Sequence, residues 1–90
     1  MQPHSASAVT EAVARNVRAE AGARRVSQGT VGAHLSLSQT NISRRFVGVT
    51  PFTVAELVEL ARIWDIPLSQ LLPETLVSRS SQAPEEGDRS

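Results

Sequence analysis

Apolar residues recur with a helical period along most of the chain. The first such segment is rich in Ala, and in it Val9, Val13 and Val17 lie four residues apart. This spacing places the three valines on one side of a helix. We expect the helix to begin with an N-cap at Ser7 and to continue to about Arg24.

The next two segments predict two short helices, over residues 28–35 and 39–47, with three residues between them. Ser27 and Ser38 precede them and are of the residue type that caps helix N-termini. The inward positions are apolar: Val31, Leu35, Ile42 and Phe46. Gly32 is small and allows another helix to approach closely. Because helices this short are not stable alone, we expect a helix-turn-helix held together by a shared apolar corner.

A fourth segment, over residues 54–64, is the most strongly apolar in the chain and predicts a fourth helix. It begins with Thr53 and Glu56 at the spacing of a capping box. Its predicted inward stripe contains four residues: Val54, Leu57, Ala61 and Trp64. Pro67 follows, and it suits the first turn of a short fifth helix that carries Leu68, Leu71 and Leu72.

These elements predict an all-α fold class, a compact five-helix domain with the helix-turn-helix as helices 2 and 3. The domain is expected over residues 7–77. Residues 1–6 are polar and contain a proline, which predicts a flexible arm. Residues 78–90 are too polar to bury enough apolar surface, so we expect a disordered tail there.

Composition excludes several classes of function. A chain of 90 residues allows one domain. It has no cysteine and two well-separated histidines, so we expect no metal, no other cofactor and no small-molecule ligand. No paired carboxylates, activated nucleophile or phosphate loop is visible, so we do not expect an enzyme. No apolar run is long enough for a membrane span and no signal peptide is evident, which favours the bacterial cytoplasm.

The net charge of zero conceals an uneven distribution. Residues 1–50 contain six arginines and two glutamates, a net charge of +4. Residues 51–90 contain three arginines and seven acidic residues, a net charge of −4. Phosphate neutralisation depends on where the cations lie rather than on their sum, so the first half of the chain is suited to contact a nucleic acid.

The outer face of the predicted third helix is polar and has no acidic residue. It consists of Gln39, Thr40, Asn41, Ser43 and Arg44. Ser, Thr and Asn are mediocre helix formers, so this face lowers helix stability and requires another explanation. Amide groups pair with adenine, a guanidinium pairs with guanine, and the Thr methyl group contacts the methyl group of thymine. The face therefore predicts contact with base edges in the major groove of double-stranded DNA.

The chain resembles the helix-turn-helix domains of phage repressors, Cro proteins and the wider lambda-repressor-like regulators. The resemblance covers about residues 9–73 and rests on the motifs RVSQ (25–28), LSQTNISRR (37–45), TPFTVAEL (50–57) and DIPL (65–68). It implies a sequence-specific DNA-binding transcriptional regulator. We expect a Cro-type or immunity repressor that occupies an operator.

The resemblance also implies roles for individual residues. The base contacts are Gln39, Thr40, Ser43 and Arg44. The phosphate contacts are Gln28, Ser38, Asn41, Thr50 and Thr53, with Asn41 also within reach of a base. Gln28 is also expected to contact and hold in place the first recognition residue, Gln39.

The chain departs from the family pattern at three positions. Ser36 occupies the turn position that is usually Gly, and Gly32 replaces the usual Ala of the second helix. Arg45 occupies a position that is commonly apolar. We expect Phe46 to anchor the helix instead and Arg45 to extend outward to a phosphate. Of the arginines in and after the first helix, Arg25 is the first candidate for a further phosphate contact.

An apolar patch on the fourth and fifth helices predicts weak self-association. Its expected members are Val58, Ile63, Leu68, Leu72 and Leu76. The chain is then a weak homodimer, or a monomer that dimerises on DNA. Two other functions stay open at this point: an antitoxin whose acidic tail, residues 74–90, binds a toxin, and a protein-interaction module whose third helix contacts protein.

Overall fold

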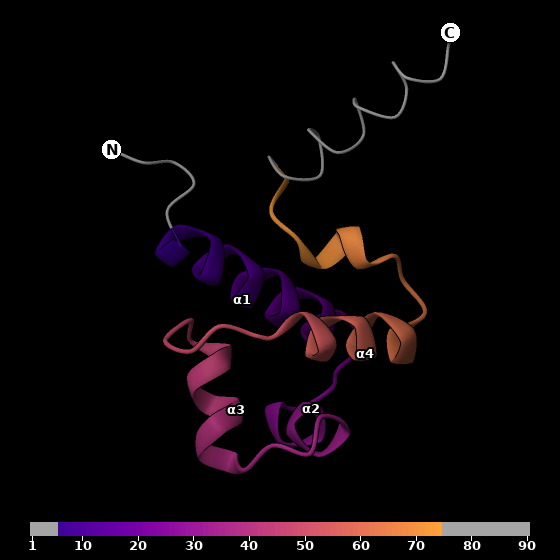
Figure 1. The fold of residues 1–90 in the computed structure, drawn as a ribbon. Coiled ribbons are helices and arrows are strands. Elements are labelled where there is room, and N and C mark those ends of the chain that lie inside the picture. Colours follow the sequence, from indigo (N-terminus) through magenta and orange to yellow (C-terminus); the bar gives the residue numbers. More distant parts are fainter. Residues whose placement is uncertain (1–5, 75–90) are drawn as a thin grey trace, which may run out of the picture.

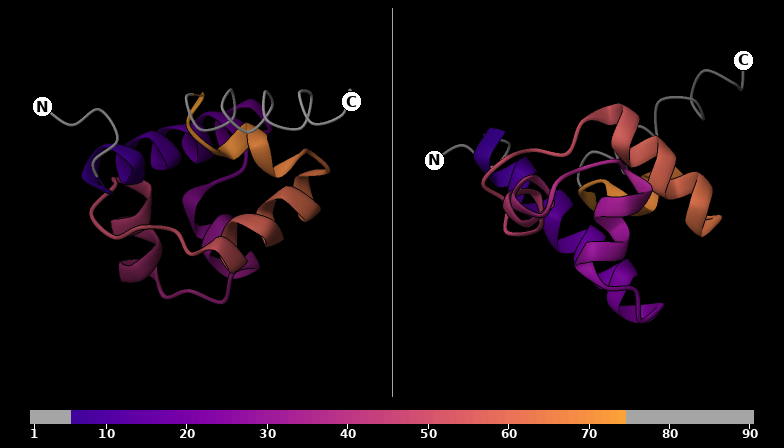
Figure 2. Two further views of the ribbon diagram at one scale, coloured as in Figure 1. Left: turned by 45° about the horizontal axis from the view of Figure 1, so that its top comes forward. Right: turned by 90° about the horizontal axis from the view of Figure 1, so that it is seen from below.

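The computed structural model describes residues 6–74, and the regular secondary structure in this part of the chain is all helical (Figure 1). Its elements are α1 (Ala6–Ala23), α2 (Gln28–His34), α3 (Gln39–Phe46), α4 (Val54–Trp64) and the 3-10 helix η1 (Leu68–Leu71). The two helices of the helix-turn-helix, α2 and α3, lie together at one end, and η1 packs against α1 and α4 (Figures 1 and 2). Within residues 6–74, no helix is long and apolar enough to cross a membrane.

The fifth helix differs from the expectation. Four α-helices are present in the described part of the chain, and the segment after Pro67 forms one 3-10 helix of four residues rather than an α-helix. Ala6, expected in the arm, already belongs to α1, so the predicted N-cap at Ser7 is wrong. The rest of the expected arm, the expected tail and the last residues of the expected domain lie outside the described residues.

The predicted caps of the other helices are confirmed. The Ser27 hydroxyl accepts a hydrogen bond from the Thr30 backbone amide at 3.1 Å and begins α2. In α3 the Ser38 hydroxyl accepts from the Asn41 amide at 3.2 Å. The capping box of α4 is complete, with Thr53 and Glu56 each accepting the other's backbone N–H. Each cap satisfies backbone donors that have no partner inside the helix.

All four α-helices end in the same way, with a residue of positive φ followed by a backbone hydrogen bond that spans six residues. The left-handed residues are Arg25, Ser36, Gly48 and Asp65. The backbone N–H of the next residue donates to a carbonyl in the last turn of the helix. These donors belong to Val26, Leu37, Val49 and Ile66. This is the Schellman motif, which satisfies the last carbonyls of a helix. Val26, Leu37 and Ile66 also pack against the core, whereas Val49 is 71% exposed.

The core takes one fully buried side chain from each element: Val17, Val31, Ile42, Leu60 and Leu71. Trp64 is also buried, as expected, and the guanidinium of Arg24 lies 5.3 Å from its ring centroid. The expected inward stripe of α4 is wrong at its first residue. Val54 is 72% exposed, and Leu60 is fully buried instead.

Close packing between α2 and α3 explains Gly32. A Cβ atom at this position would lie 3.0 Å from Ile42 Cγ2 and 3.4 Å from the Leu37 carbonyl oxygen. The two helices therefore approach closely enough that even a methyl group is crowded. Ser36 in the turn has a φ of +58°, so the left-handed conformation of the missing glycine is retained at some cost in backbone strain.

Candidate nucleic-acid interface

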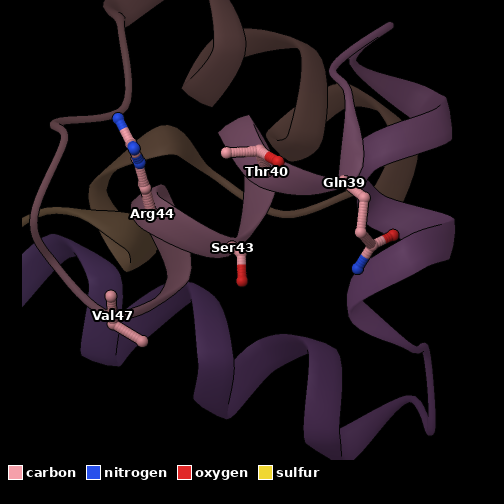
Figure 3. A pocket seen from close by; sticks show the side chains of 5 residues that line it. All are labelled: Gln39, Thr40, Ser43, Arg44 and Val47. Atoms are coloured by element: carbon pink, nitrogen blue, oxygen red, sulfur yellow. The ribbon is translucent and has the colours of Figure 1, made fainter.

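Five side chains line an open hollow on the outer face of α3 (Figure 3). They are Gln39, Thr40, Ser43, Arg44 and Val47, and the hollow has a volume of about 360 Å³. Ile42 and Phe46, on the opposite side of α3, are buried in the core and hold this face outward. The structure thus brings together the four residues predicted to contact bases. Val47 was not among the predicted contact residues.

Most polar side chains in the hollow have no partner among the residues that the structure describes. Gln39, Thr40 and Arg44 are exposed, and among residues 6–74 their side chains make no hydrogen bond or ion pair. The first turn of α3 carries no acidic residue. The hollow therefore offers amide, hydroxyl and guanidinium groups to an external molecule and contains no carboxylate that would repel an anion.

Gln28 braces a different residue from the one expected. Its side-chain nitrogen donates to the Ser43 hydroxyl at 3.3 Å, and no bond joins it to Gln39, the first residue of α3. The expected brace to the first recognition residue is therefore wrong in this structure. The contact joins α2 to the middle of α3. Since the Ser43 oxygen accepts from Gln28, its own O–H is left to donate elsewhere.

The arginines of the first half divide into two groups. Three have a side-chain partner within the fold: exposed Arg18 donates to the Phe46 carbonyl, Arg24 pairs with Glu20 at 2.8 Å, and Arg45 pairs with Glu56 at 2.9 Å. The other three, Arg15, Arg25 and Arg44, are exposed and make no side-chain contact of this kind within the described residues. Arg24 and Arg45 are neutralised by carboxylates, whereas the charges of Arg15, Arg18, Arg25 and Arg44 are not balanced by an ion pair within the described residues.

Arg45 does not extend outward, so that expectation is wrong. Its side chain is only 13% exposed, and its Nε donates to the Glu56 carboxylate that also caps the Thr53 amide. The capping box already holds the Glu56 carboxylate in place. Because the Arg45 and Glu56 side chains are both mostly buried, their charges are weakly screened by water and attract each other strongly. Arg45 therefore fixes α3 against the beginning of α4.

We expect Glu56→Ala to lower the free energy of unfolding by about 1–3 kcal/mol, because it removes half of the capping box and leaves Arg45 unpaired. Thermal or urea unfolding measures this. Glu59→Ala is the matched control on the same helix. A hydrogen bond from Arg62 lowers the pKa of Glu59, but the pair is exposed and its loss should change stability little. Equal effects of the two variants would contradict the structural role of Glu56.

The remaining predicted phosphate contacts do not line the hollow. Ser38, Asn41 and Thr53 are exposed and Thr50 is half-buried. The Ser38 and Thr53 hydroxyls are engaged as helix caps, and the Thr50 amide donates to the Arg44 carbonyl at 3.2 Å. These residues lie at the start of α3, at the start of α4 and in the loop between them.

The predicted self-association patch is smaller than expected. Val58 is 48% exposed, but Ile63, Leu68 and Leu72 are half-buried against the core. These three side chains are partly buried because η1 folds back onto α1 and α4. Leu76 lies outside the described residues. Of the predicted patch, the described part of the chain thus leaves mainly Val58 available.

The BetR domain family matches residues 4–89, nearly the whole sequence. This chain belongs to the BetR domain family. No curated protein matches it significantly. The BetR domain seen here has the predicted lambda-repressor-like helix-turn-helix fold, in which α2 and α3 are the helix-turn-helix.

Two solved structures share the fold of this BetR domain. One is the restriction-modification controller protein C.AhdI from Aeromonas hydrophila, with a TM-score of 0.62 and 19% identity over 70% of this chain and 96% of that one. The other is the DNA-binding domain of BldD, with a TM-score of 0.64 and 22% identity over 77% of this chain and 100% of that one. At these identities the likeness concerns the fold.

Proposed function

We propose that this BetR-family chain binds double-stranded DNA sequence-specifically and regulates transcription by occupying an operator, as a repressor does. The observation that carries the proposal is the exposed face of α3, where Gln39, Thr40 and Arg44 have no partner among the described residues and no acidic residue is present. Two proteins of the same fold support it, since one is a controller protein and the other a DNA-binding domain.

In the proposed complex α3 lies in the major groove, which is about 12 Å wide and admits a helix. Arg44 then pairs with a guanine and Gln39 with an adenine, while the Thr40 methyl group contacts thymine. Ser43 donates its O–H to a base acceptor, since its oxygen already accepts from Gln28. These four residues supply specificity, because base edges differ from one pair to the next and phosphates do not.

Affinity in this proposal comes from the ends of the helices and from free arginines. Arg25 follows α1 and lies just before the cap of α2, while Ser38 and Asn41 lie at the beginning of α3, whose dipole favours a phosphate. Thr50 and Thr53 extend the same contact toward α4. Arg45 has no place among these contacts, because its charge is already neutralised by Glu56.

We expect Arg25→Ala to weaken binding to every DNA sequence to the same degree and to reduce the slope of log K against log salt by about 1. The physical reason is that a phosphate contact releases counterions but carries no sequence information. Titration at several salt concentrations measures it. Arg62→Ala, which removes an arginine already paired with Glu59, is the control. A loss confined to one sequence would contradict a phosphate role for Arg25.

The experiment that tests the function is selection of bound sites from random duplexes. We expect preferred bases at several positions, in two half-sites related by symmetry and about one helical turn apart if two copies bind together. Two half-sites would also support a dimer on DNA. Pools with no preferred base at any position would overturn the proposal and favour a contact between α3 and protein.

A further inference from the structure

Val47 is an apolar residue on an otherwise polar face. It is the C-cap of α3, it is 63% exposed, and it lines the same hollow as Gln39, Thr40, Ser43 and Arg44. A scattered exposed valine needs no explanation. Val47 differs because it completes a continuous row of side chains whose other members offer hydrogen bonds to an external molecule.

The row has a defined order. Val47 follows Ser43 by four residues and Arg44 by three, which keeps it on the same side of the helix. Figure 3 shows Gln39 and Val47 at opposite ends of the row, with Ser43 between them. Eight residues of helix rise about 12 Å, which is close to the height of three or four stacked base pairs. The polar and apolar parts of the hollow would therefore face different base pairs.

The charge of the hollow favours a nucleic acid over a second copy of the chain. Arg44 is exposed and unpaired within the described residues, and the first turn of α3 carries no acidic residue. Two copies that met through this face would bring their Arg44 side chains together. A polyanion has the complementary charge, and on the base edges of the major groove the apolar group is the 5-methyl of thymine.

We propose that Val47 is a specificity-determining residue that contacts the 5-methyl group of a thymine beside the base pair read by Arg44. The inference rests on the proposed function and adds to it one base position and one chemical group. Val47 contributes an apolar surface, so it distinguishes thymine from cytosine at that position without a hydrogen bond. Val49 lies two residues further and does not line the hollow, although it is equally apolar.

The test uses the full chain and a duplex obtained by site selection. Each thymine of the half-site is replaced in turn by deoxyuridine, which removes only the 5-methyl group, and binding is titrated with the wild type and with Val47→Ala. We expect one replacement to weaken wild-type binding about fourfold, the ratio for one buried methyl-sized group, and to leave the binding of Val47→Ala unchanged. Val49→Ala, an equally exposed valine outside the hollow, is the matched control and should respond like the wild type.

The possible results distinguish a failure of the proposed role of Val47 from a failure of the proposed DNA-binding function. If Val47→Ala and every deoxyuridine replacement act additively, or if no thymine lies in the selected half-site, the role of Val47 is overturned while the DNA-binding function stands. If no site can be selected, both are overturned. Thermal unfolding of Val47→Ala should match the wild type, because the side chain is exposed. A large fall in the midpoint would assign the loss of binding to the fold and would also overturn the proposal.

Discussion

Replacement of Arg44 by alanine is expected to weaken binding to the selected duplex by about 1–3 kcal/mol, or roughly 5- to 150-fold, and to relax the preference at one base pair. Arg44 is exposed, and its guanidinium makes no contact within the described part of the chain that the fold would lose. Its backbone carbonyl, which accepts from the Val49 and Thr50 amides, is unaffected by the change. The effect should therefore fall on recognition and leave stability unchanged.

Titration against the selected duplex and against random DNA measures this prediction. Arg62→Ala is the matched control, because it removes the same charge from an exposed arginine outside the hollow. Arg25→Ala provides the contrast, since it should weaken both DNAs alike. If Arg44→Ala also weakened both DNAs equally, Arg44 would be a phosphate contact and the base-reading role of the α3 face would lose its strongest member.

Gly32→Val is expected to give the largest loss of stability, about 1–3 kcal/mol or more. The added Cβ would already lie 3.0 Å and 3.3 Å from two atoms of Ile42, and the two further methyl groups of valine deepen the clash. Because Ile42 is 1% exposed and belongs to the core, it has little room to move. Thermal unfolding should show a lower midpoint, by about 4–8 °C for each kcal/mol in a domain of this size.

Gly22→Ala is the matched control for Gly32. Both glycines lie in helices, but a Cβ at Gly22 would meet nothing within 4 Å. Alanine is favoured over glycine in a helix by up to about 1 kcal/mol, so this variant should be as stable as the wild type or slightly more stable. Similar losses for the two variants would mean that tight packing of α2 against α3 does not explain Gly32.

Much of the helix-turn-helix could be predicted from local sequence. Ser27, Ser38 and Thr53 cap the helices that they were expected to cap, and Val31 and Ile42 are buried as their spacing indicates. Caps and helical periodicity depend on residues within four positions of one another, so they are visible without a structure. The outer face of α3 follows from the same periodicity once Ile42 and Phe46 are placed inside.

Contacts between distant segments could not be predicted in this way. Arg45 was expected to extend outward because no residue of its own helix was expected to bind its side chain. The group that binds it is the carboxylate of Glu56, eleven residues further along the chain. The Gln28 side chain donates a hydrogen bond to Ser43, fifteen residues away, between α2 and α3. The short η1 packs against α1 and α4 and so partly buries Leu68 and Leu72, which a linear pattern left as surface residues. Each depends on the angle between elements, which no periodicity specifies.

The sequence by itself determined the approximate positions of the four α-helices, most of their core residues and the polar, non-acidic surface of α3, because these depend on neighbouring residues. Only the tertiary structure decided which of these groups are free. It neutralised Arg45 and left Arg44 without a partner in residues 6–74. It also placed Arg25, Ser36 and Asp65 in left-handed conformations that would ordinarily require glycine. Burial of the apolar residue after each of these three offsets the local strain, and burial is a property of the whole fold.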